Sequence, residues 1–553
     1  MQAESRDLWV AVVYSAAVGV LSLVLPVATQ SLVNTISFGM LLQPLVWLAI
    51  FVFMALIFSG TLYLLRMWVV EIIQRRVFVR IAQQVVDSLL RVRIDAFDRR
   101  YGPEIVNRFF EVVTVQKAGA TLIVEGLTVF MELIVGMAIM ALYDPILLAF
   151  DVLLFAAIVI ILFPLGSNAV RTAVKESKAK YGLVAWLGEI ARNPITFKSE
   201  WAAKMAVART DALTGEYLNS RSEHFRIIYR QAIGVALLQA VGLASLLGVG
   251  GFLVINNRLT IGQLIASELI VSAVLSGILK FSKQLETFHD LLAAVDKLGY
   301  FDELPLEEAG RESLPATGGA AIRLRGVTYH YGDIRGNTLD GIDWEIPAGS
   351  RIGLTGHTGG GKSTLLDILF GLRAPLTGAL EIDETDSRVV SLADWRTSAG
   401  LVRNPEVFEG TVAENLRLGH LDLATNDLRD GLRLAGLWEA VQALPEGLET
   451  RLTSTGRPLS QGQMVRLMLA RAIVHQPRLL LIDEALDLIE DPSECARLVD
   501  GLVDRRNPWT VVISTRRPEV LQRCDVVFSL EAGKLICQST NQTTNQPNSN
   551  RFA

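Results

Sequence analysis

Cysteine and histidine are both scarce in this sequence. Its 553 residues include three cysteines and six histidines. The cysteines, Cys495, Cys524 and Cys537, lie in the C-terminal half without paired spacing and without a histidine cluster. This pattern argues against disulfides and zinc, and it predicts packing cysteines in a reducing cytosol.

An excess of basic charge is also missing. The formal net charge is -5, whereas nucleic-acid-binding domains are usually basic, so no nucleic-acid partner is expected. Charged residues make up only 20% of the chain and hydrophobic residues 51%, with a mean hydropathy of +0.37. A chain this long and apolar exceeds one soluble core, so we expect one domain in the lipid bilayer and another outside it.

Long apolar runs mark the membrane domain, which we place at residues 1–309. A spanning helix needs about 20 apolar residues, and the first run lacks a small-residue cleavage site, so we expect a retained helix and no signal peptide. Two long charged sections are rich in Arg and Lys, whereas the short connections hold almost none apart from Arg258. The positive-inside rule then places the long sections and both termini in the cytoplasm. We expect six spans, at about residues 8–33, 41–70, 119–142, 145–165, 231–255 and 260–279.

The charged sections, 71–117 and 171–230, keep helical apolar spacing, so we expect helices that continue out of the bilayer, although an independent soluble insert is the alternative. Gly102–Glu104 and Arg192–Pro194 interrupt them, and each predicts the reversal of a helical hairpin and a contact point with the cytosolic domain. Residues 310–319 read as a linker. Alternating strand and helix patterns then predict an α/β domain over 320–537, followed by a polar, disordered tail at 538–553.

One stretch of the α/β domain fits the phosphate-loop pattern G-x-x-x-x-G-K-[ST]: Gly356-His357-Thr358-Gly359-Gly360-Gly361-Lys362-Ser363. It follows an apolar run expected to be a strand and precedes the helical pattern that begins at Thr364, which is the context that the motif requires. Such a loop cradles phosphates with backbone N–H groups. We expect ATP here, with Lys362 at the β- and γ-phosphates and Ser363 on Mg²⁺.

A second signal is the apolar run Leu479–Ile482 followed by Asp483 and Glu484. In a phosphate-loop fold, the first carboxylate holds Mg²⁺ and the second polarises the attacking water. Apolar strands that end in two acids also occur by chance. Here the pair follows Leu459-Ser460-Gln461-Gly462-Gln463, which strengthens the interpretation.

That segment is similar to the L-S-G-G-Q signature of ATP-binding-cassette (ABC) transporters, and the chain resembles exporter half-transporters with a six-helix membrane domain before one cassette. The resemblance implies a dimer in which each ATP lies between one phosphate loop and the partner's signature, here Ser460, Gln461, Gly462 and Gln463. It also implies that Tyr331 stacks on adenine; a core tyrosine at a strand end is the alternative.

Four positions depart from the family pattern. Arg403 stands where the family has a glutamine that ligates Mg²⁺, and a cation there would repel the metal. Arg516 replaces the histidine that contacts the γ-phosphate; arginine still pairs with phosphate but does not titrate near neutral pH. Gln461 replaces a glycine, and the acid after Glu484 is either Glu490 or Asp491. The alternative is ordinary drift around a fully active site.

The resemblance implies an ATPase that couples ATP binding and hydrolysis to export, and the two arginines predict slow hydrolysis at its own site. Segments Leu25–Ile36 and Ala96–Glu104 look most like the peptide- and protein-secretion branch, which often uses a periplasmic adaptor, so we expect a bacterial inner membrane. We expect no peptidase domain before the first span, and therefore no cleavage of a leader peptide by this chain. We favour a heterodimer with a second half-transporter over a homodimer. Lipid or drug export and a regulatory subunit without turnover are the alternatives.

Four carboxylates, Glu125, Glu132, Asp151 and Glu268, lie within or near the apolar runs, where an unpaired charge is costly. Glu125 and Glu132 are seven residues apart and share a helix face. They predict either a cavity for a cationic or peptide-like cargo, or residues that are protonated, paired or at helix ends; we favour the second.

Overall fold

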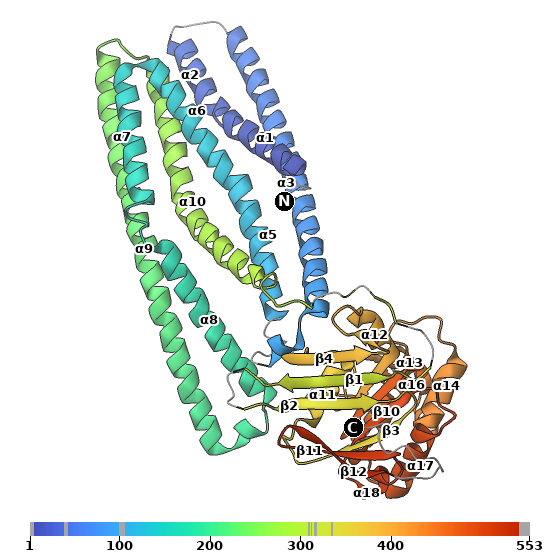
Figure 1. The fold of residues 1–553 in the computed structure, drawn as a ribbon. Coiled ribbons are helices and arrows are strands. Elements are labelled where there is room, and N and C mark those ends of the chain that lie inside the picture. Colours follow the sequence, from blue (N-terminus) through green and yellow to red (C-terminus); the bar gives the residue numbers. More distant parts are fainter. Residues whose placement is uncertain are drawn as a thin grey trace. The chain divides into compact units, whose positions relative to one another are not determined.

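The computed structural model describes residues 5–37, 42–98, 106–307, 310, 312–314, 318–332 and 336–540. It divides into two compact units (Figure 1). The first comprises Met1–Val92 and Ala96–Pro305, and the second comprises Arg93–Asp95 and Leu306–Ala553. The division after Pro305 falls close to residue 310, where the sequence predicts the linker to begin.

The first unit is helical throughout its described residues, apart from short turns. Its α-helices are α1 (Ser5–Leu21), α2 (Val24–Ser37), α3 (Leu42–Arg91), α5 (Glu111–Thr121), α6 (Leu127–Tyr143), α7 (Pro145–Leu162), α8 (Ala169–Arg192), α9 (Glu200–Ile255) and α10 (Ile261–Gly299). Apolar side chains of α6, α7, α9 and α10 form its largest buried cluster, which includes Met140, Leu147, Leu246 and Ile270.

Five helical segments are long and apolar enough to cross a membrane: Arg6–Ser37, Gln43–Arg91, Arg108–Tyr143, Pro145–Leu162 and Glu200–Ile255. They overlap the first five predicted spans, although the predicted span 41–70 begins before Gln43 and the predicted span 145–165 extends past Leu162. The sixth predicted span, 260–279, lies in α10, of which Ile261–Gly277 is described as a shorter apolar helix. Those residues would extend about 26 Å along a helix axis, close to the hydrocarbon thickness of a bilayer. Because this segment is not among the five, the sixth span stays a prediction.

The first span is not the single helix that the hydropathy pattern predicts. α1 ends at Leu21 and α2 begins at Val24. Pro26 has no N–H to donate to the carbonyl four residues earlier, at Ser22, so the helical hydrogen-bond ladder is interrupted there. The Ser22 hydroxyl instead donates to the carbonyl of Gly19 at 2.7 Å.

Two helices extend well beyond any bilayer, as the periodicity of the charged sections predicts. α3 has 50 residues and α9 has 56, which correspond to about 75 Å and 84 Å of helix against about 30 Å of hydrocarbon. α8 ends at Arg192, and α9 starts at Glu200 with Ser199 as its N-cap. The reversal predicted at Arg192–Pro194 is therefore confirmed, whereas Gly102–Glu104 lies outside the described residues.

One short connection holds the basic residue that the sequence singled out. Asp144 caps the N-terminus of α7 by accepting from the N–H of Ile146 at 2.8 Å. Its other carboxylate oxygen pairs with Arg258 at 2.8 Å. This ion pair ties the α6–α7 turn to the turn after α9.

The second unit has the α/β architecture that the sequence predicts. A six-stranded sheet has the order β12-β11-β3-β10-β9-β6, in which every neighbouring pair is parallel except β11 and β12. Its strands are β3 (Arg351–Thr355), β6 (Ala399–Val402), β9 (Leu479–Asp483), β10 (Thr510–Ser514), β11 (Val526–Glu531) and β12 (Lys534–Thr540). An antiparallel sheet of order β2-β1-β4-β5 comprises Leu339–Ile346, Ile322–Tyr329, Thr377–Ile382 and Thr385–Asp386.

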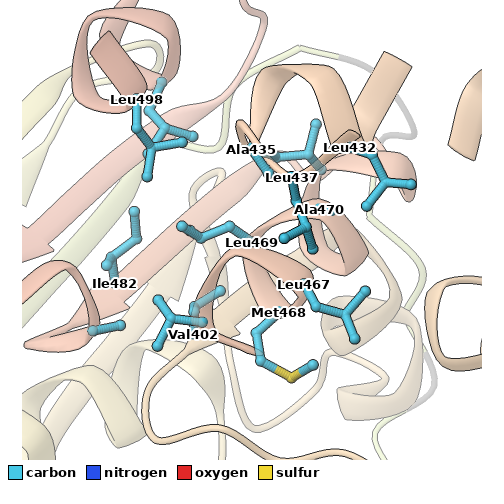
Figure 2. Close-up of a cluster of buried hydrophobic side chains, with 14 of the residues drawn as sticks. Val402, Leu432, Ala435, Leu437, Leu467, Met468, Leu469, Ala470, Ile482 and Leu498 are labelled. Atoms are coloured by element: carbon cyan, nitrogen blue, oxygen red, sulfur yellow. The ribbon is translucent and has the colours of Figure 1, made fainter. Parts of the chain in front are cut away.

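Helices pack around the parallel strands (Figure 1). They are α11 (Lys362–Phe370), α12 (Leu392–Ser398), α13 (Val412–Arg417), α14 (Thr425–Leu434), α15 (Trp438–Gln442), α16 (Gln461–Val474), α17 (Pro492–Val503) and α18 (Pro518–Leu521). Every residue of β9 and β10 is buried, as expected for parallel strands covered on both faces. Figure 2 shows one of the buried clusters, with Val402 of β6 and Ile482 of β9 near Leu467–Ala470 of α16 and Leu498 of α17.

Two expectations about the end of the chain need correction. The predicted disordered tail begins at residue 538, but β12 continues to Thr540, because Thr540 pairs with Val526 of β11 through backbone hydrogen bonds that need no apolar side chain. Residues 541–553 lie outside the described part. Cys495 and Cys524 are buried, and burial raises the pKa of the Cys524 thiol to about 12. Cys537 is exposed, so it is not a packing residue.

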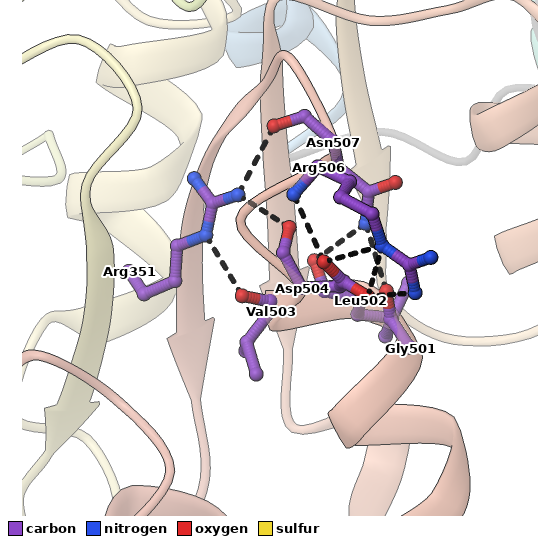
Figure 3. Close-up of polar contacts among 7 residues, drawn as sticks. All are labelled: Arg351, Gly501, Leu502, Val503, Asp504, Arg506 and Asn507. Carbon is purple, nitrogen blue, oxygen red and sulfur yellow. Dashed lines mark hydrogen bonds and ion pairs between the residues drawn. The ribbon is translucent and has the colours of Figure 1, made fainter.

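A buried arginine fixes the start of β3, the strand that leads into the phosphate loop. The Arg351 side chain is only 3% exposed, and Figure 3 shows it directed at the loop after α17. Its guanidinium donates to five backbone carbonyls, those of Gly349, Val503, Asp504, Asn507 and Trp509, at 2.5–3.1 Å. One side chain therefore holds β3 and the α17–β10 loop together.

We expect Arg351→Met to destabilise the second unit by about 3 kcal/mol or more, because it leaves several buried carbonyls without donors. Thermal unfolding of the full-length protein in detergent, followed by tryptophan fluorescence, measures the change. The matched control is Arg506→Met in the same loop, whose side chain is 89% exposed and pairs with Asp504 at 2.5 Å. The control should unfold at nearly the wild-type temperature; equal losses for the two variants would contradict the role given to Arg351.

Candidate nucleotide-binding site

The predicted phosphate loop joins β3 to α11, as the motif requires. Gly356 has a φ of 140°, and a Cβ there would lie 2.4 Å from the carbonyl oxygen of Leu530. Gly361 has a φ of 96° and caps α11, and its Cβ would lie 2.8 Å from the carbonyl of Thr338. Both positions therefore need glycine for conformation and for space. Between them, His357, Thr358 and Gly359 are exposed and Gly360 is half-buried, so this part of the loop is open to a ligand.

Lys362 lies folded under the loop and is only 4% exposed. Its ammonium donates to the carbonyls of Gly356 and His357, each at 3.0 Å. It also pairs with a carboxylate oxygen of Glu484 at 3.2 Å. The structure thus brings together the loop lysine and the acid predicted to position water.

Asp483 is the last residue of β9 and Glu484 follows it directly. Glu484 has a φ of 53°, a left-handed conformation that costs free energy for a residue with a Cβ. Its N–H donates to the carbonyl of Ser514, the last residue of β10, at 2.9 Å. This turn directs the Glu484 carboxylate toward Lys362 and leaves the side chain 39% exposed.

Arg516 follows β10 and reaches the same carboxylate. Its guanidinium donates to the Thr358 hydroxyl of the phosphate loop and lies 3.9 Å from Glu484. The side chain is 55% exposed, so it is free to turn toward a phosphate. The structure therefore places Arg516 at the loop, where the sequence predicts a phosphate contact.

Arg403 comes directly after β6 and is the most heavily paired of the predicted site residues. Its Nε donates to Asp483 Oδ2 at 2.6 Å, and its Nη2 donates to Asp367 Oδ1 at 2.8 Å. The same Nη2 donates to the backbone carbonyl of Ser363 at 3.1 Å. Burial alone would lower the pKa of Arg403, but the two carboxylates outweigh it and the pKa is raised.

Asp367 belongs to this site although the sequence did not point to it. It lies one helical turn beyond Ser363 on α11 and is 4% exposed. Besides Arg403, it accepts from Arg373 Nε at 3.1 Å. An acidic residue inside an otherwise apolar helix was a usable signal, because buried acids are nearly always paired. Its partner Arg403 is remote in sequence, so the pairing itself was not predictable.

Tyr331 lies beside the loop helix, with its hydroxyl 3.0 Å from the hydroxyl of Thr364. Its ring lies 5.3 Å from that of Tyr329, edge to face, and 4.7 Å from the guanidinium of Arg373. The structure therefore connects Tyr331 to Thr364 and to the network around Asp367. Stacking on adenine stays a prediction.

The signature segment forms its own structure at the start of α16. Ser460 caps the helix and exchanges hydrogen bonds with Gln463: the Gln463 N–H donates to the Ser460 hydroxyl at 3.3 Å, and the Ser460 N–H donates to Gln463 Oε1 at 2.8 Å. Gln461 is the exposed first residue of the helix, and Gly462 has ordinary contact distances. Among the described residues, the side-chain hydrogen bonds of Ser460 and Gln463 are with each other, so these side chains do not join the segment to the phosphate loop of its own chain.

Asp491, one of the two candidates for the acid after Glu484, also makes its hydrogen bonds within its own segment. Asp491 caps α17 by accepting from the N–H of Ser493 at 2.8 Å, whereas Asp487 accepts from the Thr515 hydroxyl at 2.5 Å. Asp491 thus has a structural role of its own.

The donor set predicted for Mg²⁺ does not fit a divalent cation as it is arranged. Octahedral Mg²⁺ needs oxygen ligands, but one oxygen of Asp483 is taken by Arg403. Its other oxygen, Oδ1, is buried and has no hydrogen-bond partner among the described residues. A dication near this guanidinium would be repelled by about 4 kcal/mol for each unit of its charge at 4 Å and an effective dielectric constant of 20.

The intramembrane carboxylates differ in exposure. Glu125 and Glu268 are exposed and Glu132 is half-buried within the unit. Asp151 on α7 is 1% exposed, and neither of its oxygens has a hydrogen-bond partner among the residues that the structure describes. Asp151 is thus the one of the four that is fully enclosed.

Two family models match the chain. The model described as ABC transporter matches residues 339–487, and the model described as ABC transporter transmembrane region matches residues 8–193. The match to the transmembrane-region model covers the first membrane spans and the first charged section. The match to the ABC transporter model covers the phosphate loop, the signature segment, and Asp483 and Glu484 at the end of β9.

The chain is similar to several proteins of this kind. It is 28% identical to the mycobactin import ATP-binding/permease protein IrtB of Mycolicibacterium thermoresistibile, over 56% of this chain and 54% of that protein. It is 27% identical to the ATP-dependent lipid A-core flippase of Methylococcus capsulatus, over 84% of this chain and 77% of the flippase. The chain thus spans about half the length of the first relative and about three quarters of the second.

Among solved structures, a bacterial Atm1-family ABC exporter with ATP bound has a TM-score of 0.82 with this chain, at 20% identity. The likeness covers 96% of this chain and 94% of that one. At this identity it shows the fold: a helical membrane domain followed by an α/β nucleotide-binding domain.

Replacing Asp367 with Asn should destabilise the second unit by about 3 kcal/mol and weaken ATP binding, because two guanidiniums lose a buried partner. Thermal unfolding and equilibrium dialysis of ATP measure the two effects. Asp386→Asn is the control, since Asp386 is only half-buried and pairs at 2.5 Å with Arg388, which is exposed. A wild-type unfolding temperature for Asp367→Asn would show that the buried pairs contribute little.

Proposed function

Because this chain belongs to the ABC transporter family and carries its ATPase domain, we propose that it is an exporter subunit that couples ATP binding and hydrolysis to alternating access. The observation that carries this proposal is the joining of Lys362, Glu484 and Arg516 at one glycine-rich loop. A helical membrane domain in the same chain supplies the part that moves substrate. We place it in a bacterial inner membrane, with the nucleotide-binding domain and both termini in the cytoplasm.

In this proposal, ATP closes a dimer of nucleotide-binding domains. Each ATP would lie between the phosphate loop of one subunit and residues Ser460–Gln463 of the other. The helix start at Ser460 supports this role, because its exposed N-terminus presents N–H groups and a partial positive charge to an anion. Closure would pass to the membrane through the helical hairpin between α8 and α9 and its counterpart after α3.

Hydrolysis would follow in-line attack of water on the γ-phosphorus. The bond from the water oxygen to phosphorus forms as the bond to the β–γ bridging oxygen breaks, which leaves ADP and phosphate. Glu484 would orient the water and accept its proton, while Lys362 and Arg516 offset the charge on the phosphate oxygens. The Mg²⁺ expected at Ser363 and Asp483 has no step in this scheme, because Arg403 holds the Asp483 carboxylate.

We infer that this subunit's own site binds ATP well and hydrolyses it slowly. Arg403 pairs with Asp483, the acid that corresponds to the Mg²⁺-holding residue in phosphoryl transfer by phosphate-loop enzymes. Arg516 and Lys362 both pair with Glu484, so the acid is held by two cations before water can use it. Slow turnover favours a heterodimer in which the partner's site does most of the hydrolysis; a homodimer would combine two slow sites.

The cargo in this proposal belongs to the peptide- and protein-secretion class, with a periplasmic adaptor, on the resemblance of Leu25–Ile36 and Ala96–Glu104. Lipid or drug export is the second candidate. A regulatory subunit that binds ATP without turnover is the third, and the pairing of Arg403 with Asp483 favours it over a fully active site.

The slow site has a direct test in ATPase measurements on the full-length protein in nanodiscs. We expect turnover below about 1 s⁻¹, against a typical enzyme rate of about 10 s⁻¹. The double variant Arg403→Gln, Arg516→His should hydrolyse at least about tenfold faster, a change of about 1.4 kcal/mol in the barrier. Adding Glu484→Gln to that variant should remove the gain. Fast wild-type hydrolysis that Glu484→Gln abolishes would contradict the proposal.

The dimer has a separate test. Purification of the tagged chain from its own membranes should bring down a second, differently sequenced half-transporter in equal amount, measured by mass spectrometry. The phosphate-loop variant Lys362→Met should retain that partner, because dimer contacts in the membrane do not need ATP. A preparation that contains this chain alone and moves substrate with ATP would rule out both the heterodimer and the purely regulatory role.

A further inference from the structure

The guanidinium of Arg403 contacts the two residues that correspond to the metal-binding pair of phosphate-loop enzymes. In those enzymes the loop Ser or Thr and the acid at the end of a neighbouring strand bind Mg²⁺. Here the corresponding residues are Ser363 and Asp483, and Arg403 contacts both: Asp483 through Oδ2 at 2.6 Å, and Ser363 through its backbone carbonyl at 3.1 Å, not through the hydroxyl that would ligate a metal. A fixed cation therefore bridges the helix and the strand that a metal would bridge.

The backbone explains why the guanidinium stays there. β6 pairs in parallel with β9, with Val402 opposite Ile482, so the residues that follow, Arg403 and Asp483, emerge at the same edge of the sheet. Asp367 on α11 holds the other side of the guanidinium at 2.8 Å. A planar fork held by two carboxylates loses little freedom when it forms these bonds.

Charge balance points the same way. Asp367 and Asp483 are each 4% exposed, and buried carboxylates need compensating charge. Arg403 and Arg373 supply two positive charges for these two negative ones. A metal ion is not required for neutrality, and adding one would place like charges together.

We propose that Arg403 takes the place of the divalent cation, so that this site binds ATP in its metal-free form. The inference rests on the proposed function, since it requires that the loop bind ATP. Lys362, Arg403 and Arg516 then supply the positive charge that faces the triphosphate, and Asp483 keeps Arg403 in position. The proposal explains why the chain has an intact phosphate loop although Asp483 is paired with Arg403 and not free to bind a metal.

The test measures the affinity of the full-length protein for radiolabelled ATP by equilibrium dialysis, once with Mg²⁺ and once with excess EDTA. We expect the two dissociation constants to agree within about threefold for the wild-type chain. Arg403→Gln should bind ATP at least about tenfold more weakly in EDTA than in Mg²⁺, a difference of about 1.4 kcal/mol. Arg388→Gln, which removes an exposed arginine of the same unit, should keep the wild-type ratio.

Arg403→Gln leaves buried acids unpaired and can fail to fold, so the double variant Arg403→Gln, Asp367→Asn removes one charge of each sign. It should show the same dependence on Mg²⁺ as the single variant. A wild-type protein that loses ATP in EDTA at least about tenfold, or variants that keep the wild-type ratio, would overturn the inference. Absence of ATP binding in both buffers would overturn the proposed function itself, and the two failures are therefore distinguishable.

Discussion

The contact between Arg403 and Asp483 is the interaction on which the site depends. Parallel strands deliver their C-terminal ends to one edge of a sheet, and β6 and β9 lie side by side there. The residue that follows β6 therefore meets Asp483, the acid at the end of β9. With arginine at that position, the acid gains a permanent cation at 2.6 Å, and the ion pair of Arg403 with Asp367 at 2.8 Å joins α11, the helix after the phosphate loop, to the sheet. Nucleotide chemistry in this chain starts from that arrangement.

The membrane unit contains two long helices that would carry movements of the nucleotide-binding domain toward the membrane. Helices α3 and α9, of 50 and 56 residues, are continuous from apolar segments into charged ones. A continuous helix transmits displacement better than a jointed segment, because its hydrogen bonds resist bending. In the proposed function, the turn between α8 and α9 would carry such a displacement, and an ATP site that binds tightly and hydrolyses slowly would hold it in one position for longer.

Much of this was predictable from the sequence, for reasons that differ by element. The phosphate loop was predictable because Gly356 and Gly361 occupy conformations and spaces that only glycine fits. Hydropathy located five helical segments that are long and apolar enough to cross a membrane. It did not show the break within the first of them, which depends on Pro26. The predicted α/β domain ended at residue 537, three residues before the end of β12, because Gln538–Thr540 are polar. Strand pairing needs only backbone hydrogen bonds, so polar residues can continue a strand. The network of Asp367 with Arg403 was not predictable, because it depends on which strand lies next to β9, and strand order is not written in local periodicity.

If Arg403 takes the place of the divalent cation, ATP binds this site without a metal. The metal content of the bound nucleotide tests this most directly. The full-length chain is equilibrated with ATP and Mn²⁺, rapidly desalted, and analysed for protein-bound ATP and for manganese by electron paramagnetic resonance and elemental analysis. We predict bound ATP with far less than one manganese per nucleotide. One manganese for each bound ATP would contradict it.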